Sequence, residues 1–203
     1  MSKQETLWFW QKSRLTAEWF EVYSFTSKEY PHPCLINRPD KPTNSEPWSY
    51  SSVDEQQRLR VYTPQEHVSS APPMWYLLVR EYGNPRKPTQ SLVAFADDRF
   101  EDGIVIEFEK FKTLNYDISE RVAAMRWGFG DPHIEQLYVV ENYRRRKISI
   151  KLINVADIVN VAGNWGGFIY GGDQVTQDGE ALSREWSHSS RLRPIEARLP
   201  PMD

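Results

Sequence analysis

The sequence predicts a mixed α/β (α+β) fold, and three patterns carry that prediction. Runs of β-branched and aromatic residues from residue 74 onward are separated by turn signals, which is typical of neighbouring strands. A further apolar run, residues 137–140, stops at Glu141-Asn142 and is followed by a short basic loop. Beyond that loop, apolar residues recur at the helical period. This order of strand, basic loop and helix start favours anion binding, because unpaired amides and the helix dipole are directed at the loop.

The first 73 residues divide into an aromatic segment and a proline-rich segment. Residues 5–25 mix charged side chains with aromatic ones at helical spacing, which predicts an amphipathic helix. Its aromatic stripe is expected to pack on the core, with partner binding as the alternative. Residues 30–50 contain five prolines and are expected to form a loop or an irregular arm.

Three strands are expected in the middle of the chain. Residues 74–81 (MWYLLVRE) and 91–96 (SLVAFA) flank a Gly-Asn-Pro turn signal, so they are expected to pair as a hairpin. Residues 103–111 alternate apolar and charged side chains, which predicts a half-exposed strand. The pattern of residues 117–127 leaves helix and strand open.

Strand and helix are expected to alternate in the last third of the chain. Residues 134–140 are expected to form a buried strand that leads into the basic loop. A helix is expected from about 148 to 161, ended by the glycines that follow it. A short strand over 168–170, a last helix over 180–186 and an extended tail over 191–203 complete the predicted order.

Composition limits the classes of function. The 203 residues suit one domain with an extension, or two small domains. A net charge of −3 and a pI near 5.9 argue against a general nucleic-acid binder, which would be basic. Cys34 is the only cysteine, which excludes an intrachain disulfide and a cysteine-rich zinc site. The N-terminal residues lack a long apolar core, so neither a signal peptide nor a membrane span is expected, and the cytoplasm is the simplest compartment.

Sequence motifs for metal or nucleophile chemistry are also missing. The four histidines are scattered without the spacing of metal ligands, so no metal is expected. Neither a Walker loop nor a Gly-x-Ser-x-Gly nucleophile motif is present. These absences leave the basic loop as the main candidate for function.

Residues 137–153 (LYVVENYRRRKISIKLI) resemble a motif of the GNAT N-acetyltransferase superfamily, L-x-V-x-P-x-Y-R-G-x-G-I-G-x-x-L-L. The matching residues are Leu137, Val139, Tyr143, Arg144, Ile148, Leu152 and Ile153. The resemblance implies a GNAT-like domain over about residues 74–190, with a mixed, mainly antiparallel sheet flanked by helices. Residues 1–73 would then be an aromatic-rich N-terminal region packed on this domain, and residues 191–203 an extended tail.

The chain departs from the motif at positions that affect the loop. Glu141 stands at the proline position, Lys147 at a glycine position and Ser149 at the second small position. Glycine lets backbone amides approach a phosphate closely and tolerates positive φ. Serine is a modest change. The side chain of Lys147 either folds away and adds positive charge, or fills the loop and blocks it.

The resemblance implies acetyl-CoA, or another acyl-CoA, as cofactor and an amine as acceptor. In the family, the strand before the loop splays from its neighbour and pairs with the pantetheine arm, while loop amides face the pyrophosphate. The cofactor-binding residues implied here are Leu137, Val139, Arg144, Arg145, Arg146, Lys147, Ile148 and Ser149. A solvated loop, or a patch for another polyanion, is the alternative for the basic residues.

The candidates for acid–base chemistry are Glu135, His133 and Tyr170. By the period of two, His133, Glu135, Leu137 and Val139 are expected to share one face of the strand. His133 suits proton uptake at neutral pH, and Glu135 is the residue type that the family often uses on this strand. The alternative is that Asp131, His133 and Glu135 mark the solvated end of the strand. Tyr170 would either act as the acid or pack.

The sequence therefore predicts an acyl-CoA-dependent N-acyltransferase of the GNAT type, a cytoplasmic transferase with an unidentified amine acceptor. One alternative is a catalytically inactive GNAT-like protein that binds a macromolecule. The other is a GNAT-fold enzyme that modifies a nucleic-acid base. Exposed aromatic residues in the first 25 positions are compatible with a homodimer, and no membrane partner is expected.

Overall fold

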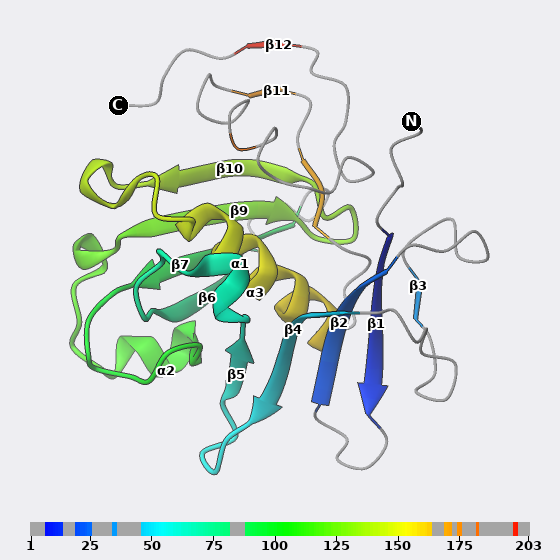
Figure 1. Ribbon diagram of the computed structural model, residues 1–203. Helices are drawn as coiled ribbons and strands as arrows, with labels where there is room; N and C mark the ends of the chain where they lie inside the picture. Colours follow the sequence, from blue (N-terminus) through cyan, green and yellow to red (C-terminus); the bar gives the residue numbers. More distant parts are fainter. Residues whose placement is uncertain are drawn as a thin grey trace.

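Two five-stranded sheets lie on either side of one long helix in the computed structural model of the chain (Figure 1). The structure describes residues 7–13, 19–25, 34–35, 46–81, 88–163, 169–171, 174–175, 182 and 197–198. The first sheet contains, in spatial order, β3 (Cys34–Leu35), β1 (Leu7–Ser13), β2 (Trp19–Phe25), β4 (Glu46–Val53) and β5 (Leu59–Tyr62). The second sheet contains β10 (Ile134–Val139), β9 (Ala123–Gly128), β7 (Thr89–Phe95), β6 (Trp75–Glu81) and β8 (Val105–Glu107).

The amphipathic helix expected over residues 5–25 is wrong. The segment contains two antiparallel strands, β1 and β2, in which Leu7 lies opposite Phe25 and Ser13 lies opposite Trp19. Tryptophan, phenylalanine and tyrosine favour strands, and pairing between the two halves of the segment outweighs the helical spacing of its apolar residues.

The proline-rich stretch is more regular than expected at its ends. β3 and the start of β4 lie within residues 30–50. The pairing of β4 with β2 shifts register between two successive pairs, Val22–Ser49 and Tyr23–Pro47, so Pro47 lies at the irregularity. A strand accepts a residue without an amide proton at such an irregularity, so the proline does not prevent β4 from forming.

The hairpin expected within residues 74–96 is confirmed. β6 and β7 are antiparallel, and Leu78 lies opposite Leu92. Side chains alternate along β6, so that Tyr76 belongs to the larger apolar core and Trp75 to a second cluster on the other face of the sheet. The sheet is therefore covered on both faces.

The strand expected over residues 103–111 is only partly correct. β8 ends at Glu107, and α2 (Phe108–Lys112) begins directly after it. The helical turn brings the ring of Phe111 within 5.9 Å of the Phe95 ring centroid, so burial of Phe111 decides the conformation. The ambiguous residues 117–127 form a short 3-10 turn, η2 (Ile118–Glu120), and then β9.

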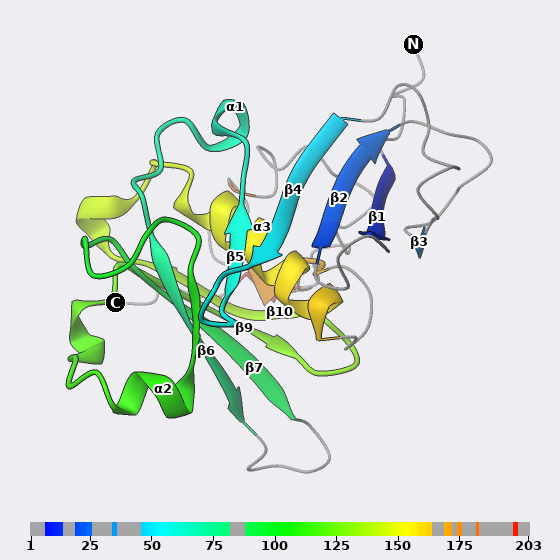
Figure 2. The same cartoon turned by 90° about the horizontal axis from the view of Figure 1, so that it is seen from below.

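The helix expected after the basic loop is confirmed as α3 (Ile148–Ala162). It contacts strands of both sheets and lies between them (Figure 2). Residues 151–160 are all buried, including the polar side chains of Lys151, Asn154, Asp157 and Asn160. A helix with one apolar face was expected, but the N-terminal sheet covers the opposite face as well.

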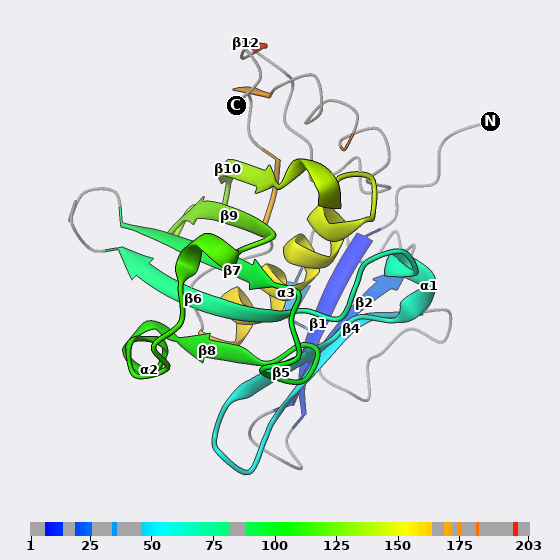
Figure 3. The ribbon, with the colours of Figure 1, turned by 90° about the vertical axis from the view of Figure 1, so that its left-hand side faces the viewer.

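The two sheets are joined through β5 and the residues before β8 (Figure 3). The amide of Val61 donates to the carbonyl of Gly103 at 2.9 Å, and Arg60 forms an antiparallel bridge with Ile104. Gly103 has φ +86°, and a Cβ built on it would lie 2.0 Å from the carbonyl oxygen of Val61. Only glycine allows the two backbones to approach this closely.

The C-terminal predictions lie mostly outside the described residues. Of the short strand expected over 168–170, Ile169 and Tyr170 are described, and Tyr170 forms a parallel bridge with His133. Of the helix expected over 180–186, Leu182 alone is described, and it is helical. In the tail, β12 (Ala197–Arg198) pairs in parallel with β11 (Gln174–Val175). The described part of the chain is a mixed α+β structure with mainly antiparallel sheets flanked by helices, as the sequence predicts.

Candidate functional site

β10 is an edge strand of its sheet, and among the described residues no further strand pairs along its outer edge. The amide of Val140, directly after the strand, donates to Val122 beside β9 at 2.9 Å. Backbone groups alternate between the two edges of a strand, so those of Leu137 and Val139 are directed away from β9. The carbonyl of Val139 accepts a hydrogen bond from Nε of Arg144 at 3.1 Å. The strand was expected to be buried, but its residues are half-exposed or exposed because no strand covers this edge within the described residues.

An irregularity at Glu135 divides β10 into two parts. Ile134 lies opposite Trp127 and Gln136 lies opposite Arg126, so Glu135 is the extra residue of a bulge. The side chains of Ile134, Leu137 and Val139 all pack against the core that contains α3. The prediction that His133 and Glu135 share a face with Leu137 and Val139 is therefore wrong, because the bulge interrupts the period of two.

A second segment, residues 169–171, pairs with the chain at the start of β10. Tyr170 donates its amide to Pro132 at 3.1 Å, and Ile134 donates to Tyr170 at 2.9 Å. The carboxylate of Asp157 on α3 accepts the amide of Ile169 at 2.8 Å. Beyond Ile134 the described residues provide no further pairing between the two segments. The chain thus runs from β10 through α3 to a parallel segment that touches β10 only near His133.

The basic loop (residues 144–147) connects β10 and the turn η3 (Glu141–Tyr143) to the start of α3. Within it φ is +60° at Arg145 and +55° at Lys147, and it is not positive at Arg146 between them. Alternation of this kind turns successive amides toward a common concavity, a nest that suits an anion. All four basic residues are exposed, and the guanidinium of Arg146 lies 5.6 Å from the centroid of the Tyr143 ring.

The amides at the loop and at the helix start have no internal partner. The first backbone bond of α3 runs from Lys151 to the carbonyl of Lys147 at 3.1 Å. Within the described part of the chain, the amides of residues 145–149 donate to no acceptor. The side chain of Ile148 is buried, so this residue offers its amide alone, and Ser149 is half-buried. Five successive amides without an acceptor in the described residues therefore lie at the positive end of a helix dipole.

The three residues predicted for acid–base chemistry lie together where β10 meets Tyr170. Nε2 of His133 is 3.8 Å from Oε1 of Glu135. Nδ1 of His133 is 3.1 Å from the backbone carbonyl oxygen of Asp131 and 3.5 Å from its carboxylate. The hydroxyl of Tyr170 donates to the other carboxylate oxygen of Asp131. Asp131, His133, Glu135 and Tyr170 form what we call the polar cluster.

Sequence reasoning placed three members of the polar cluster and did not assign a role to Asp131. Its alternation with His133 and Glu135 was visible, but it indicated only a solvated strand end. The contact with Tyr170 joins residues 39 positions apart. No local signal carries such a contact, because it depends on the parallel return of the chain after α3.

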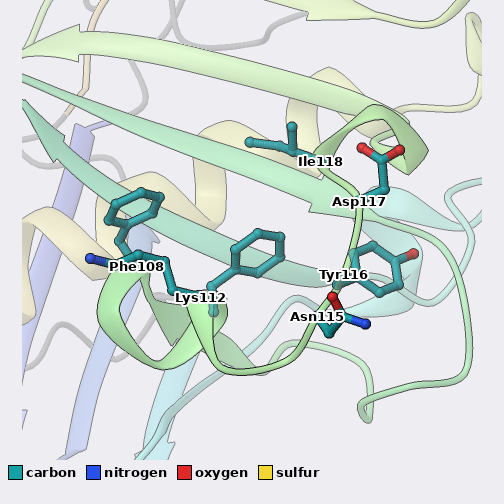
Figure 4. A pocket seen from close by; sticks show the side chains of 7 residues that line it. Phe108, Lys112, Asn115, Tyr116, Asp117 and Ile118 are labelled. Atoms are coloured by element: carbon teal, nitrogen blue, oxygen red, sulfur yellow. The ribbon is translucent and has the colours of Figure 1, made fainter.

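A separate hollow of about 520 Å³ lies beside α2 (Figure 4). Phe108 and Ile118 are its exposed apolar residues, at 40% and 44%, and Lys112, Tyr116 and Asp117 line it as well. Burial and the hydrogen bond to Asp97 raise the pKa of Tyr116. None of the predicted site residues lines this hollow.

Comparisons with protein-family models, with curated proteins and with solved structures find no match to this chain. Among the described residues no helix is both long and apolar enough to span a membrane. The same residues contain no group of three or more side chains arranged to hold a metal ion. The candidate site is thus defined by the open edge of β10, the basic loop and the polar cluster.

Proposed function

We propose that the protein is an acyl-CoA-dependent N-acyltransferase. The observation that carries the proposal is the set of amides over residues 145–149 that find no acceptor in the described part of the chain, next to a strand edge that no described strand covers. The positive φ values lie at residues 145 and 147, where the family motif has glycine. The loop therefore adopts a conformation that suits glycine, although Arg145 and Lys147 occupy it, at a cost on the order of 1–2 kcal/mol each.

The residues present fit a diphosphate followed by an extended amide-containing arm. The amides of residues 145–149 suit phosphate oxygens, and the exposed guanidinium groups of the basic loop add charge-assisted contacts. The outward backbone groups of Leu137 and Val139 suit the amides of the arm, as one more strand would. In this proposal Arg144 exchanges its bond to the carbonyl of Val139 for a phosphate contact.

The polar cluster supplies the groups for amine activation. An acyl-CoA brings an activated thioester, whose thiolate is a fair leaving group and needs no strong acid. His133, with Nδ1 directed at the carbonyl of Asp131, presents Nε2 to take a proton from the amine. Glu135, 3.8 Å from Nε2, suits the cationic form of the acceptor before it loses that proton.

Titration calorimetry of the purified protein with acetyl-CoA tests the proposal. We expect micromolar binding that weakens roughly tenfold to a hundredfold in Arg144→Ala, since one charge-assisted phosphate contact is lost. Arg121→Ala is the matched control, because Arg121 is an exposed arginine outside the site. Absence of binding at millimolar acetyl-CoA would overturn the proposal.

The four exposed basic side chains of the loop favour a second candidate, an inactive binding module for a polyanion. Its affinity for single-stranded or double-stranded nucleic acid would fall steeply with salt. Such binding, unchanged by saturating acetyl-CoA and lost in Arg145→Ala with Arg146→Ala, would favour this candidate over the transferase.

A further inference from the structure

The turn between β9 and β10 brings one residue into contact with both proposed acid–base groups. The backbone carbonyl of Asp131 accepts the amide of His133 at 2.7 Å and lies 3.1 Å from Nδ1 of the same residue. The carboxylate of Asp131 accepts the hydroxyl of Tyr170 from the segment after α3. Asp131 therefore links the histidine ring to the tyrosine through its own backbone and side chain.

The position of this turn is set from β9 by Gly128. A Cβ on Gly128 would lie 2.5 Å from the carbonyl oxygen of Asp131 and 3.4 Å from Nδ1 of His133. The amide of Gly128 also donates to the carbonyl of His133 at 3.2 Å. The turn thus lies directly against β9 on one side, while Tyr170 holds it on the other.

The arrangement favours one tautomer of His133, because a carbonyl oxygen can only accept a hydrogen bond. Nδ1 carries the proton when it donates to the carbonyl of Asp131, and this leaves the lone pair on Nε2. Nε2 is directed toward Glu135. The charged groups that face the ring within the described residues are Asp131 and Glu135, and the ring of Tyr170 lies 6.2 Å from it between centroids.

The same contacts change the role expected for Tyr170. Its hydroxyl proton is directed at the carboxylate of Asp131 and not at an open site. A phenol bonded in this way is a poor proton donor to a leaving group, but it anchors the carboxylate that accepts from it. Tyr170 is placed to hold the turn of Asp131 against β10, at the point where its own backbone pairs with Pro132.

We propose that Asp131, anchored by Tyr170, is a positioning residue that holds His133 in the tautomer and orientation needed to accept the amine proton. This inference rests on the proposed acyltransferase function. Asp131 does not touch the acceptor in this arrangement. It acts through the carbonyl that binds Nδ1, and Tyr170 acts through Asp131.

Steady-state kinetics of three variants tests the inference. Asp131→Ala should lower kcat roughly tenfold to a hundredfold, less than complete loss of a general base, and leave the KM for acetyl-CoA within about twofold. Asp131→Asn keeps an acceptor for Tyr170 and should retain at least about a third of kcat. Asp98→Asn, at an exposed position, is the matched control. An Asn variant as slow as the Ala variant would overturn the positioning role.

A double-mutant cycle distinguishes a linked pair from two separate effects. Tyr170→Phe and Asp131→Ala should lower kcat to a similar extent, and the double variant should be no slower than Asp131→Ala. Effects that multiply would show that the two residues act independently, and the inference would fail. Thermal unfolding of each variant establishes that it is folded before its rate is compared.

Nitrogen chemical shifts of the His133 ring give a readout that needs no activity, with His133→Gln for assignment. The ligand-free protein should show the Nδ1-protonated tautomer, and Asp131→Ala a mixture of both. If acetyl-CoA does not bind but the shifts behave as expected, the transferase proposal fails and the linkage of Asp131 to His133 stands. If acetyl-CoA binds and is turned over while neither shifts nor kcat respond to Asp131→Ala, the inference alone fails.

Discussion

The two edges of the sheet formed by β6 to β10 differ in which residues pair with them. At the β8 edge, β5 of the other sheet approaches so closely that the amide of Val61 donates to the carbonyl of Gly103, and Arg60 forms a bridge with Ile104, just before β8. At the β10 edge, the pairing with Tyr170 that the described residues provide ends at Ile134, and the carbonyl of Val139 accepts a hydrogen bond from the Arg144 side chain. Proteins usually cover or blunt open edges, because unpaired strands recruit other chains. Within the described residues no strand covers β10 beyond Ile134, and the loop amides beside it find no acceptor, so this is where we expect a ligand.

The largest expected effect on stability comes from separating β5 from the residues before β8. Gly103→Ala should destabilise the protein by more than about 3 kcal/mol, because the new Cβ would overlap the carbonyl of Val61 and the sheets would have to separate. Gly130→Ala is the matched control: its φ is also positive, at +83°, but nothing lies within 4 Å of the added Cβ. We expect about 1 kcal/mol there. Equal losses in urea unfolding would contradict the role given to close approach.

An ion pair between the buried Lys151 on α3 and the partly exposed Asp102 should give the next largest effect when it is broken. Nζ of Lys151, with a side chain 4% exposed, lies 2.7 Å from Asp102 and 3.0 Å from the carbonyl of Pro72. Asp102→Ala should cost about 3 kcal/mol, because it leaves a buried ammonium without its partner. Lys151→Met should cost less, since it removes the charge as well. A larger loss of stability in Lys151→Met than in Asp102→Ala would show that the carboxylate matters only for its bond to the Met74 amide.

Asp97, which follows β7, should give a pH-dependent effect of intermediate size on stability. Burial acts to raise its pKa, but hydrogen bonds from Tyr116, Arg99 and Trp75 prevail and hold the pKa below its ordinary value of 3.8. A depressed folded-state pKa means that this stabilisation is full above the unfolded pKa and is lost as pH falls through the folded one.

Asp97→Ala should therefore lower the free energy of unfolding by about 2 kcal/mol at neutral pH. The loss should be smaller in strong acid, because the wild-type carboxyl is protonated there and its hydrogen bonds are already weaker. Denaturant unfolding between pH 2 and 7 measures the difference. Asp98→Ala serves as the control, at an exposed neighbouring position. A cost that stays constant over this range would contradict the assignment.

The smallest effect on stability is expected in the basic loop after β10, and it should be stabilising. Lys147→Gly removes the strain of a positive φ, so the melting temperature should rise by a few degrees, about 1 kcal/mol, with acetyl-CoA binding retained. Arg146→Gly in the same loop is the control, because φ is not positive there and only flexibility is added. Loss of stability in both variants would show that the loop conformation is not strained.

The elements predicted well are those with strong local signals. Turn residues between two apolar runs predict the hairpin of β6 and β7, and the helical spacing of apolar residues predicts α3. The candidate site was predicted from residues 133–149 together with Tyr170, and in the structure His133 lies near both Glu135 and the ring of Tyr170. The side-chain pattern of β10 was not predictable, because a bulge at Glu135 depends on the register with β9 and not on local composition.

By itself the sequence determined the succession of strand, basic loop and helix, because a strand run, a change to helical period and a charged turn are local properties. Tertiary structure alone decided that residues 5–25 form strands, that α3 is covered on both sides, and that Tyr170 reaches Asp131. Each of these depends on pairing between segments far apart in the chain. Such pairing is selected by the free energy of the whole fold, and local propensity does not report it.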